Sequence, residues 1–352
     1  MTLEETRKKI DLVDSEIINM LNERMELILK ARNFKKDIED PAREKEVIEN
    51  VKKSATLIVN SGFSEEIFKS IVKESKNVQK QHLKLVGFQG EHGAYGEIGI
   101  RVLDKNAVPI PCTEFADVFE GVKSGQLDSG LVPIENSIEG PVNQVNDLLI
   151  ESDLGIVGEM NLPVHHCLLA IPDTDYREIK VVYSHPQALG QCRGFISRNK
   201  LEARPYYDTA GAAQMLAKER PKAAAVIASK LCAEIYGLEI LKENIEDHES
   251  NSTRFIIVAK EKSSEKGDKC SVVFSTLHRA GALFSVLKIF SDSNINLTRI
   301  ESRPIRKEPK KFAFLLDFQG SDKDQKIIDA MEKMKRETAM FKFLGCYKGD
   351  SQ

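Results

Sequence analysis

The sequence lacks long hydrophobic runs, an excess of charge of one sign, and closely spaced cysteine pairs. It contains no apolar segment of the signal-peptide type and no 18-residue apolar span, which predicts a cytoplasmic protein. Its formal net charge of −3 provides no basic surface, so we expect small molecules as partners and neither nucleic acid nor membrane. The six cysteines form no C-x-x-C pair, which favours buried reduced thiols over disulfides.

Metal ligands at useful spacings are also scarce. The run His165-His166-Cys167 places three potential ligands side by side, but neighbouring residues on a strand point to opposite faces. No further ligand stands at a suitable distance along the chain. We therefore predict no metal site.

What is present describes an ordinary globular protein of two or three domains, with 352 residues of which 30% are charged and 41% hydrophobic. Residues 1 to about 80 show only helical periodicity, and residues 84–260 alternate short β-rich runs with helices. After a charged segment at 260–269, the remaining residues follow the order βαββαβ. These patterns predict a helical domain, an α/β domain and a ferredoxin-like α+β domain. The strands expected in the α/β segment are 84–88, 130–132, 155–157, 166–171, 180–183, 223–228 and 253–259.

The first helix carries a cation where an apolar stripe should run. No proline or glycine occurs between Leu3 and about Lys36, and Arg24 falls within a heptad row of apolar residues. An unpaired guanidinium on a core face costs several kcal/mol. Arg24 therefore either pairs with a carboxylate such as Asp14 or awaits an anionic ligand. The other members of its row are Leu3, Ile10, Ile17 and Ala31, and the apolar face is bordered by Arg7 and Lys35.

The length of this helix predicts a second chain. About 33 residues span roughly 50 Å, whereas an 80-residue globule measures only about 30 Å across. The overhang predicts an intertwined homodimer. Arg7 and Arg24 are separated by roughly 25 Å along the helix axis, so if both bind one small anion, one of them comes from the partner chain.

Further polar side chains are spaced to meet in the helical segment. A break at Asp40-Pro41 precedes the second helix, and Ser64 is predicted to be the N-cap of the third. The resulting pocket contains cations and hydrogen-bond donors but no nucleophile and no histidine. It suits a reaction that needs restraint of a bound dianion rather than proton transfer. Its members are Arg24, Lys35, Asp40, Arg43, Glu44, Ser75 and Gln79.

This segment resembles the all-helical chorismate mutases over residues 1–82. The motifs that carry the resemblance are Arg7, Arg24, Lys35, Asp40-x-x-Arg43-Glu44 and Ser75-x-x-x-Gln79. The resemblance implies that chorismate rearranges to prephenate, with its two carboxylates held by Arg24 and by Arg7 of the partner subunit. It further implies that Arg43 assists at the carboxylates, that Lys35 and Gln79 donate to the ether oxygen, and that Glu44 accepts the substrate hydroxyl. Asp40 and Ser75 complete the predicted binding set.

In the middle segment, polar residues gather where predicted strands end. One such run is residues 133–140, and another is Ser184-His185-Pro186-Gln187, with Gln191 on the next helix. The carboxyl ends of strands in open α/β sheets are where ligands bind. Ser184 is predicted to cap a helix whose free N–H groups could hold a carboxylate. A capped turn without a ligand is the alternative for each motif.

Residues 84–260 resemble prephenate dehydratase. The motifs are Gly90-x-x-Gly93-Ala94-Tyr95, Val132-Pro133-Ile134-Glu135-Asn136-Ser137, Ser184-His185-Pro186-Gln187 and Asn251-Ser252-Thr253-Arg254-Phe255. The resemblance implies two lobes of the type II periplasmic-binding-protein fold with the substrate between them. Prephenate would lose carbon dioxide and its ring hydroxyl to give phenylpyruvate. No cofactor is expected, because the electrons of the departing carboxylate flow through the ring into the leaving group.

The same resemblance assigns roles to individual residues. Thr253 would act on the leaving hydroxyl, while Asn136, Ser184 and Gln191 position the substrate. A threonine is a poor free acid, so Thr253 either donates a hydrogen bond or relays a proton whose source, Glu135 or His185, the sequence leaves open. Gly96 departs from the family, which usually has a small hydroxyl residue there. The remaining predicted substrate-binding residues are Ser137, Gln187, Arg254 and Phe255.

Residues 268–352 resemble the ACT domains attached to these enzymes, through Arg279-Ala280-Gly281-Ala282-Leu283 and Glu301-Ser302-Arg303-Pro304. The resemblance implies that phenylalanine binds between two such domains and lowers dehydratase activity. Backbone N–H groups freed by Gly281 would hold its carboxylate. A domain that only dimerises is the alternative. The predicted phenylalanine-binding residues are Gly281, Ala282, Leu283, Glu301, Ser302, Arg303 and Pro304.

The sequence thus predicts a multidomain chain with an all-α mutase domain (1–82), a two-lobed α/β dehydratase domain (84–260) and a ferredoxin-like ACT domain (268–352). It would act, at least as a dimer, as a bifunctional chorismate mutase and prephenate dehydratase of phenylalanine biosynthesis, inhibited by phenylalanine. Two alternatives remain open at this point: a dehydratase that prefers arogenate, and an amino-acid sensor without catalytic activity.

Overall fold

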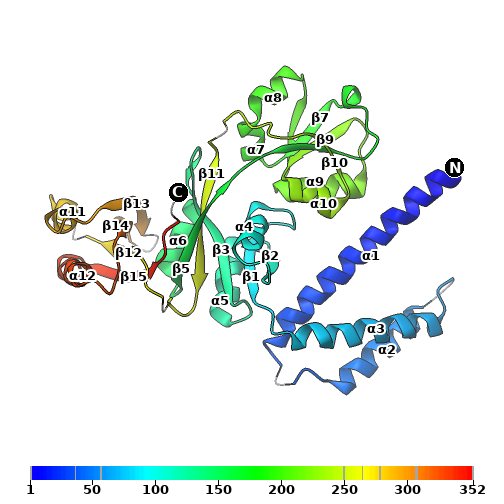
Figure 1. The fold of residues 1–352 in the computed structure, drawn as a ribbon, viewed down its shortest axis with the longest axis horizontal. Helices are drawn as coiled ribbons and strands as arrows, with labels where there is room; N and C mark the ends of the chain where they lie inside the picture. Colours follow the sequence, from blue (N-terminus) through cyan, green and yellow to red (C-terminus); the bar gives the residue numbers. More distant parts are fainter. Residues whose placement is uncertain are drawn as a thin grey trace. The chain divides into compact units, whose positions relative to one another are not determined.

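The computed structural model describes residues 2–35, 37–55, 58–248, 250–263, 265–276, 279–305 and 308–350. The chain forms two compact units, Met1–Leu85 and Val86–Gln352 (Figure 1). The first unit is entirely helical. The second holds three sheets with their helices, so the multidomain architecture predicted from the sequence is confirmed. None of the described helices is both long and apolar enough to cross a membrane.

Three helices make up the first unit: α1 (Leu3–Arg32), α2 (Pro41–Ser54) and α3 (Ser61–Lys80). The prediction that α2 follows the Asp40-Pro41 break is confirmed, because the Asp40 side chain accepts the N–H of Arg43 as the N-cap. The predicted N-cap of α3 is wrong. Asn60 caps this helix by accepting the N–H of Phe63, and the Ser64 hydroxyl donates to the Asn60 carbonyl within the first turn. The predicted end of the first helix at Lys36 lies outside the described residues, and α1 ends at Arg32.

Helix α1 is mostly uncovered within its own unit. Its apolar side chains Leu3, Ile10, Ile17 and Met20 are 49–70% exposed, whereas Leu29 near its C-terminal end is buried. Thirty residues correspond to about 45 Å of helix. The long apolar face is therefore available to a second chain.

The second unit begins with a sheet of order β2-β1-β3-β11-β5, with β4 paired to β3. Strands β1 and β3 are parallel, whereas β11 runs antiparallel to both β3 and β5. The strands are β1 (Leu85–Gln89), β2 (Val108–Cys112), β3 (Ser129–Asn136), β4 (Gly140–Pro141), β5 (Gly155–Pro163) and β11 (Ser252–Ala259). Its helices are α4 (Tyr95–Leu103), α5 (Phe115–Ser124) and α6 (Asn143–Glu151). This sheet and its helices form the first lobe.

A second sheet of order β10-β6-β9-β7-β8 forms the second lobe. Its strands are β6 (Cys167–Ala170), β7 (Val181–Ser184), β8 (Glu202–Pro205), β9 (Ala224–Ala228) and β10 (Glu239–Lys242). The helices are η1 (Tyr176–Glu178), α7 (Pro186–Gln191), α8 (Arg193–Arg198), α9 (Thr209–Glu219) and α10 (Lys230–Tyr236). The chain passes into this lobe after β5 and returns to the first lobe at β11, so two crossings join the lobes.

The last sheet has the order β13-β14-β12-β15 and confirms the predicted βαββαβ pattern. Its elements are β12 (Lys269–Ser275), α11 (Ala282–Asp292), β13 (Leu297–Ile305), β14 (Glu308–Gln319), α12 (Gln325–Glu337) and β15 (Met340–Tyr347). The predicted end of its first strand at Leu277 lies outside the described residues. The sheet packs α11 and α12 over a core that includes Phe290, Phe318 and Met334.

Four strands of the two lobes were not predicted: β2, β4, β8 and β10. They have two to five residues each. β2 contains two prolines, and every residue of β8 is exposed. Such strands are held by pairing with their neighbours and leave little hydrophobic pattern in the sequence.

We predict that Ile17→Glu exposes α1 to solvent exchange, because a charge on the apolar face opposes its burial by a partner chain. Hydrogen exchange of the full-length protein should show slow amides over residues 8–20 in the wild type and fast amides in the variant. Val102→Glu, which changes another exposed apolar residue on a helix of the other unit, is the control. Fast exchange of these amides in the wild type would contradict a covered helix.

Candidate active sites and the regulatory strand

Arg24 of α1 meets α3 at a small polar cluster. Its Nη1 donates to Ser75 Oγ at 2.6 Å, and Gln79 Nε2 donates to the Ile28 carbonyl at 3.0 Å. Ser75 and Gln79 are each 3% exposed. Among the described residues no carboxylate pairs with Arg24, so pairing with Asp14 does not account for this cation. Partial burial lowers the pKa of Arg24.

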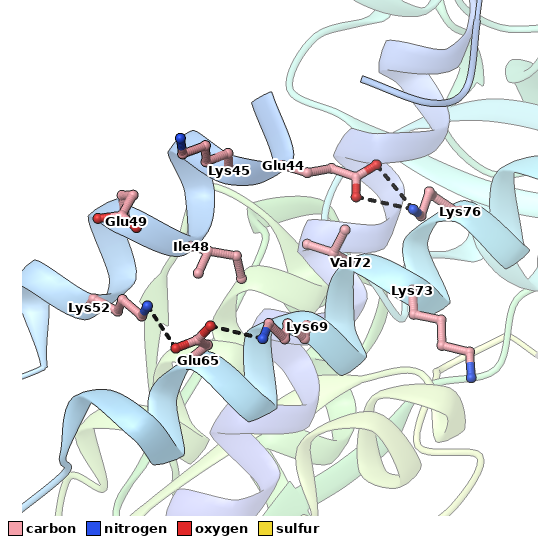
Figure 2. Close-up of a pocket in the computed structure, with 10 residues that line it drawn as sticks. All are labelled: Glu44, Lys45, Ile48, Glu49, Lys52, Glu65, Lys69, Val72, Lys73 and Lys76. Carbon is pink, nitrogen blue, oxygen red and sulfur yellow. Dashed lines mark hydrogen bonds and ion pairs between the residues drawn. The ribbon is translucent and has the colours of Figure 1, made fainter. Parts of the chain in front are cut away.

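Glu44 of α2 is held by a lysine that the sequence analysis did not single out. Lys76 Nζ lies 3.1 Å from both carboxylate oxygens of Glu44. The pair stands at one end of a cavity of about 340 Å³ between α2 and α3, as Figure 2 shows. At the other end, hydrogen bonds from Lys52 and Lys69 lower the pKa of Glu65 to about 2. The sequence feature that points to Lys76 is its position directly after Ser75, a residue of the predicted site.

The other predicted residues of this unit lie apart from the Arg24 cluster. Asp40 is used as the cap of α2, and Arg43 points to Glu46, with an ion pair of 2.7 Å. Arg7 and Lys35 are exposed. Within one chain the structure therefore brings together Arg24, Ser75 and Gln79, and leaves the remaining cations outside the cluster.

In the two-lobed part, Asn136 and Thr253 are opposite each other in the antiparallel pairing of β3 and β11. Asn136 Oδ1 accepts the backbone N–H groups of Ile138 and Glu139, both at 3.0 Å. Its Nδ2 consequently faces the other way and donates to Thr253 Oγ1 at 3.0 Å. Asn136 is 5% exposed, so this hydrogen bond is protected from water.

The amide of Asn136 begins a buried chain of hydrogen bonds. Nδ2 also donates to Asn251 Oδ1 at 3.0 Å, and Asn251 Nδ2 donates to Gln191 Oε1 at 3.0 Å. The same oxygen of Gln191 lies 2.8 Å from His166 Nε2. His166 Nδ1 in turn lies 3.0 Å from the hydroxyl oxygen of Tyr95. These hydrogen bonds thus link β3 and β11 of one lobe to α7 and the residue before β6 in the other.

Two members of this chain have shifted pKa values. Burial lowers the pKa of His166, although its hydrogen bond to Gln191 and the charge of Glu246 oppose the shift. Burial raises the pKa of Tyr95 well above its usual value, and its hydroxyl donates to the His165 carbonyl at 2.6 Å. Asn251 and Tyr95 stand within the motifs noted in the sequence, but His166 was considered only as a metal ligand. No group of three metal-ligating side chains occurs in the described part of the chain.

The prediction that Ser184 caps α7 is wrong. Its side chain is fully buried and donates to the Ile227 carbonyl at 2.6 Å, because a residue at this point of β7 faces the interior of the lobe. His185 is the cap, and its Nδ1 accepts the N–H of Gln187 at 3.3 Å. The Gln187 side chain is exposed. Ser137 fastens the loop after β3, since its hydroxyl donates to Ser250 O and accepts from Ser252 N.

Arg254 and Phe255, which were predicted to bind the substrate, have structural partners within the chain. The Arg254 guanidinium forms ion pairs of 2.6 Å with Glu159 and 2.7 Å with Asp317 of β14. Its pKa is raised by the charges of Asp317 and Glu159 although burial opposes this. Phe255 is 3% exposed and belongs to the core of the first lobe. Residues that alternate along β11 cannot all face the ligand.

Glu135, one of the two proton sources that the sequence left open, is in contact with the last sheet. Arg299 of β13 lies 3.7 Å from the Glu135 carboxylate through Nε and donates through Nη2 to Asn146 of α6 at 2.8 Å. Four residues further along β13, Arg303 binds Asp147 with two hydrogen bonds of 2.7 and 3.0 Å. Arg303, which was predicted to bind phenylalanine, thus contacts α6 in the structure.

Three of the predicted regulatory residues, Gly281, Ala282 and Leu283, line a cavity of about 490 Å³. Gly281 has φ +79°, a conformation that favours glycine, and it is the N-cap of α11. Ser302 and Pro304 pair in register with Phe314 and Phe312 of β14, which line the cavity. Cross-strand partners share one face of a sheet. Glu301 alternates with them and lies on the same side of β13 as Arg299 and Arg303. Residues that line the cavity include Arg279, Gly281, Ala282, Leu283, Phe312 and Phe314.

The glycine at position 96 has a local packing reason. A Cβ atom at Gly96 would approach the Cβ of Phe88 to 2.9 Å, closer than real Cβ contacts. A hydroxyl residue could therefore stand here only if Phe88 moved. The backbone of α4 lies against β1 at this point instead.

Comparison with protein families gives three matches along the chain. Residues 6–80 match "Chorismate mutase type II", residues 86–263 match "Prephenate dehydratase", and residues 271–336 match "ACT domain". The prephenate dehydratase model alone spans half of the chain.

Individual relatives agree with these matches. A "Bifunctional chorismate mutase/prephenate dehydratase" of Aquifex aeolicus is 34% identical over 98% of this chain and 97% of its own length. "Arogenate dehydratase 2" of Petunia hybrida is 39% identical over 76% of this chain and 72% of its own. A crystal structure of prephenate dehydratase in complex with L-Phe from Arthrobacter aurescens has a TM-score of 0.70 at 32% identity, covering 75% of this chain and 89% of that one.

The full-length agreement with the Aquifex aeolicus protein, the three family matches in order, and the placement of Asn136 beside Thr253 identify the family. The chain belongs to the bifunctional chorismate mutase/prephenate dehydratases that carry a C-terminal ACT domain.

Proposed function

We propose that this protein converts chorismate to prephenate in its helical domain and prephenate to phenylpyruvate between its two lobes, with inhibition by phenylalanine at the ACT domain. The observation that carries the dehydratase proposal is the hydrogen bond from Asn136 Nδ2 to Thr253 Oγ1. We further propose that the protein is a cytoplasmic homodimer whose domains span residues 1–82, 84–260 and 268–352. Ser137, Ser184 and Gln187 are proposed to form part of the cleft wall and not to act as catalytic groups.

The dehydratase step follows from the geometry of Thr253. Its oxygen accepts a hydrogen bond from Asn136, so its own hydrogen is free to donate elsewhere. Donation to the ring hydroxyl of prephenate stabilises that oxygen as its bond to carbon breaks and negative charge grows on it. The carboxylate carbon leaves as carbon dioxide, and its bonding electrons enter the ring. The side chain of Thr253 thus supplies stabilisation where the leaving group forms.

The mutase step needs charge without acid–base chemistry. In the Arg24 cluster, Ser75 and the Ile28 carbonyl hold the guanidinium and the Gln79 amide in place before substrate arrives. A cation about 4 Å from a substrate carboxylate contributes on the order of 4 kcal/mol at an effective dielectric constant of about 20. The second carboxylate requires another cation, and Arg7 of the partner subunit can supply it only in a dimer, given its distance of roughly 25 Å along α1.

Arogenate is the second candidate substrate, because a relative named as an arogenate dehydratase is 39% identical over 76% of this chain. Arogenate differs from prephenate in carrying an ammonium group where prephenate has a keto oxygen. A side chain that offers a hydrogen-bond donor there favours prephenate, and one that offers an acceptor favours arogenate.

We predict that purified full-length protein converts chorismate first to prephenate and then to phenylpyruvate, and that phenylalanine slows the second step. Arg24→Ala should abolish the use of chorismate while added prephenate is still converted, because the two sites lie in separate domains. Product formation from chorismate, prephenate and arogenate, measured separately, tests this. Turnover of none of the three would leave the amino-acid sensor as the remaining explanation.

We predict that Thr253→Val lowers the kcat of the dehydratase by about 10²- to 10⁴-fold, the usual contribution of a group that assists proton transfer or leaving-group stabilisation. Valine keeps the shape of the side chain and removes the hydroxyl. Thr253→Ser, which keeps the hydroxyl, is the matched control and should retain most of the activity. Mutase activity of the same preparations checks that the protein is intact. Equal activity of the Val and Ser variants would exclude a role of this hydroxyl.

We predict that Arg299→Gln weakens inhibition by phenylalanine about fivefold or more without abolishing its binding. Arg299 connects β13 of the ACT domain to both Asn146 and the Glu135 carboxylate next to Asn136, and allosteric coupling is typically about 1–3 kcal/mol. Lys288→Gln on α11, which removes an exposed pair with Asp292, is the control. Isothermal calorimetry measures binding and the dehydratase assay measures inhibition. Unchanged inhibition in Arg299→Gln would show that the coupling runs elsewhere.

A further inference from the structure

The orientation of every amide in the buried chain can be deduced from one end. Asn136 Oδ1 faces two backbone N–H groups, those of Ile138 and Glu139, which can only donate. The oxygen must therefore stand there and the NH₂ group must face Asn251. Because Asn251 then receives a hydrogen bond on its oxygen, its own NH₂ group faces Gln191. Amide orientations are assigned by such networks of partners.

The same reasoning continues to the imidazole of His166. The oxygen of Gln191 faces the Asn251 NH₂ group, and it also lies 2.8 Å from His166 Nε2. Two acceptors cannot form a hydrogen bond, so Nε2 must carry the hydrogen. Burial lowers the pKa of His166 and favours its neutral form. Nδ1 is then the unprotonated nitrogen, so the single hydrogen of the Tyr95 hydroxyl is shared between Nδ1, at 3.0 Å, and the His165 carbonyl, at 2.6 Å.

With both of its lone-pair positions used by these donors, the Gln191 oxygen cannot turn toward the cleft. The opposite end of the amide, Nε2 with two N–H groups, has no hydrogen-bond partner among the residues that the structure describes. Gln191 is 6% exposed. These two unused donors can bind an acceptor group of a ligand, and an anionic group most strongly.

We propose that His166, in its Nε2–H form, is a positioning residue that makes Gln191 present its NH₂ group rather than its oxygen to the substrate. This inference rests on the proposed dehydratase function and adds the residue that sets the selectivity of Gln191 for an acceptor group, such as the carboxylate of prephenate. His166 itself does not touch the substrate. Three of the links are amides, which transmit orientation and do not transfer protons at catalytic rates.

Glu246 binds the backbone at His166, and Tyr95 packs against its ring. Glu246 accepts the backbone N–H of His166 at 2.9 Å and the His165 ring at 2.8 Å. Burial raises the pKa of Glu246, but the bonds from His165 and from the His166 N–H outweigh this and lower it. The Tyr95 ring packs edge-on against the His166 ring with centroids 5.7 Å apart. A ring that turned over would break its contacts with Gln191 and Tyr95.

Two substitutions of nearly equal size separate positioning from mere packing. In His166→Gln the amide nitrogen takes the place of Nε2 and can still donate to Gln191. In His166→Asn the polar group reaches only to the place of Nδ1. We expect the KM for prephenate to rise about tenfold in His166→Asn, as for loss of one hydrogen bond to a charged group, and to change less than about threefold in His166→Gln.

The controls use the full-length enzyme. His165→Gln changes the neighbouring exposed histidine, whose side chain is outside the chain of hydrogen bonds, and should leave the KM unchanged. The mutase activity of each preparation reports that the protein is intact. Equal KM values for His166→Asn and His166→Gln would overturn the proposal, because packing alone would then explain the effect.

The state of the ring can be measured without any substitution in the tested protein. In the ¹⁵N spectrum of histidine-labelled wild-type enzyme, the resonances lost in His166→Gln belong to His166, and we expect a protonated Nε2 and an unprotonated Nδ1. The reverse assignment would overturn the proposal even if His166→Asn failed to fold. Absence of turnover of both prephenate and arogenate, with the expected ¹⁵N pattern, would refute the proposed function while leaving the amide orientation established.

Discussion

Two backbone N–H groups that both donate to Asn136 Oδ1 determine which way the side-chain amides of the buried hydrogen-bond chain are oriented. They belong to the loop after β3, which Ser137 fastens to Ser252 at the start of β11. Because a side-chain amide can be satisfied in only one orientation beside two donors, Asn136 must direct its NH₂ group at Thr253 and Asn251. The Thr253 hydroxyl in one lobe and the Gln191 amide in the other are thereby ordered by a single turn. A buried network of this kind is stable only if every member is satisfied.

The neighbour of Thr253 serves a different part of the molecule. Side chains alternate along β11, so Thr253 turns to Asn136 while Arg254 turns to Asp317 and Glu159. Glu159 also receives Lys269 at the start of β12, at 2.8 Å. Strand β11 is thus anchored to the sheet of the ACT domain by charges that are almost fully buried. Removing one partner of such a pair costs about 3–5 kcal/mol. Arg299 and Arg303 of β13 also bind α6. The ACT domain thus contacts both β3, which carries Asn136, and β11, which carries Thr253.

What the sequence could predict follows from the range of the interactions. The bounds of α11 and the βαββαβ order depend on local periodicity, and the motif resemblance placed Asn136 and Thr253 together. The N-cap of α3 was misassigned because Asn60 and Ser64 are both good capping residues four positions apart. The capping role of Ser184 was misassigned, and the partners of Arg254 and Phe255 were not foreseen, because they involve Ile227, Asp317 and the first-lobe core, which are distant in sequence. His166 was missed for the same reason: its function depends on a glutamine 25 residues away whose orientation is set by a third element.

In the helical domain as well, a complete site would need a distant residue, here one from a second chain. Its cluster of Arg24, Ser75 and Gln79 is complete as a clamp for one carboxylate, but chorismate carries two. The apolar residues of α1 are exposed along the part of the helix that holds Arg7. Burying each of these side chains contributes about 1.5–3 kcal/mol, so the hydrophobic gain of pairing two α1 helices would also carry Arg7 of the partner subunit to the substrate. In the proposed dimer, assembly and catalysis would therefore depend on one helix, and a chain that could not dimerise through α1 would lose the second cation that we propose for its active site.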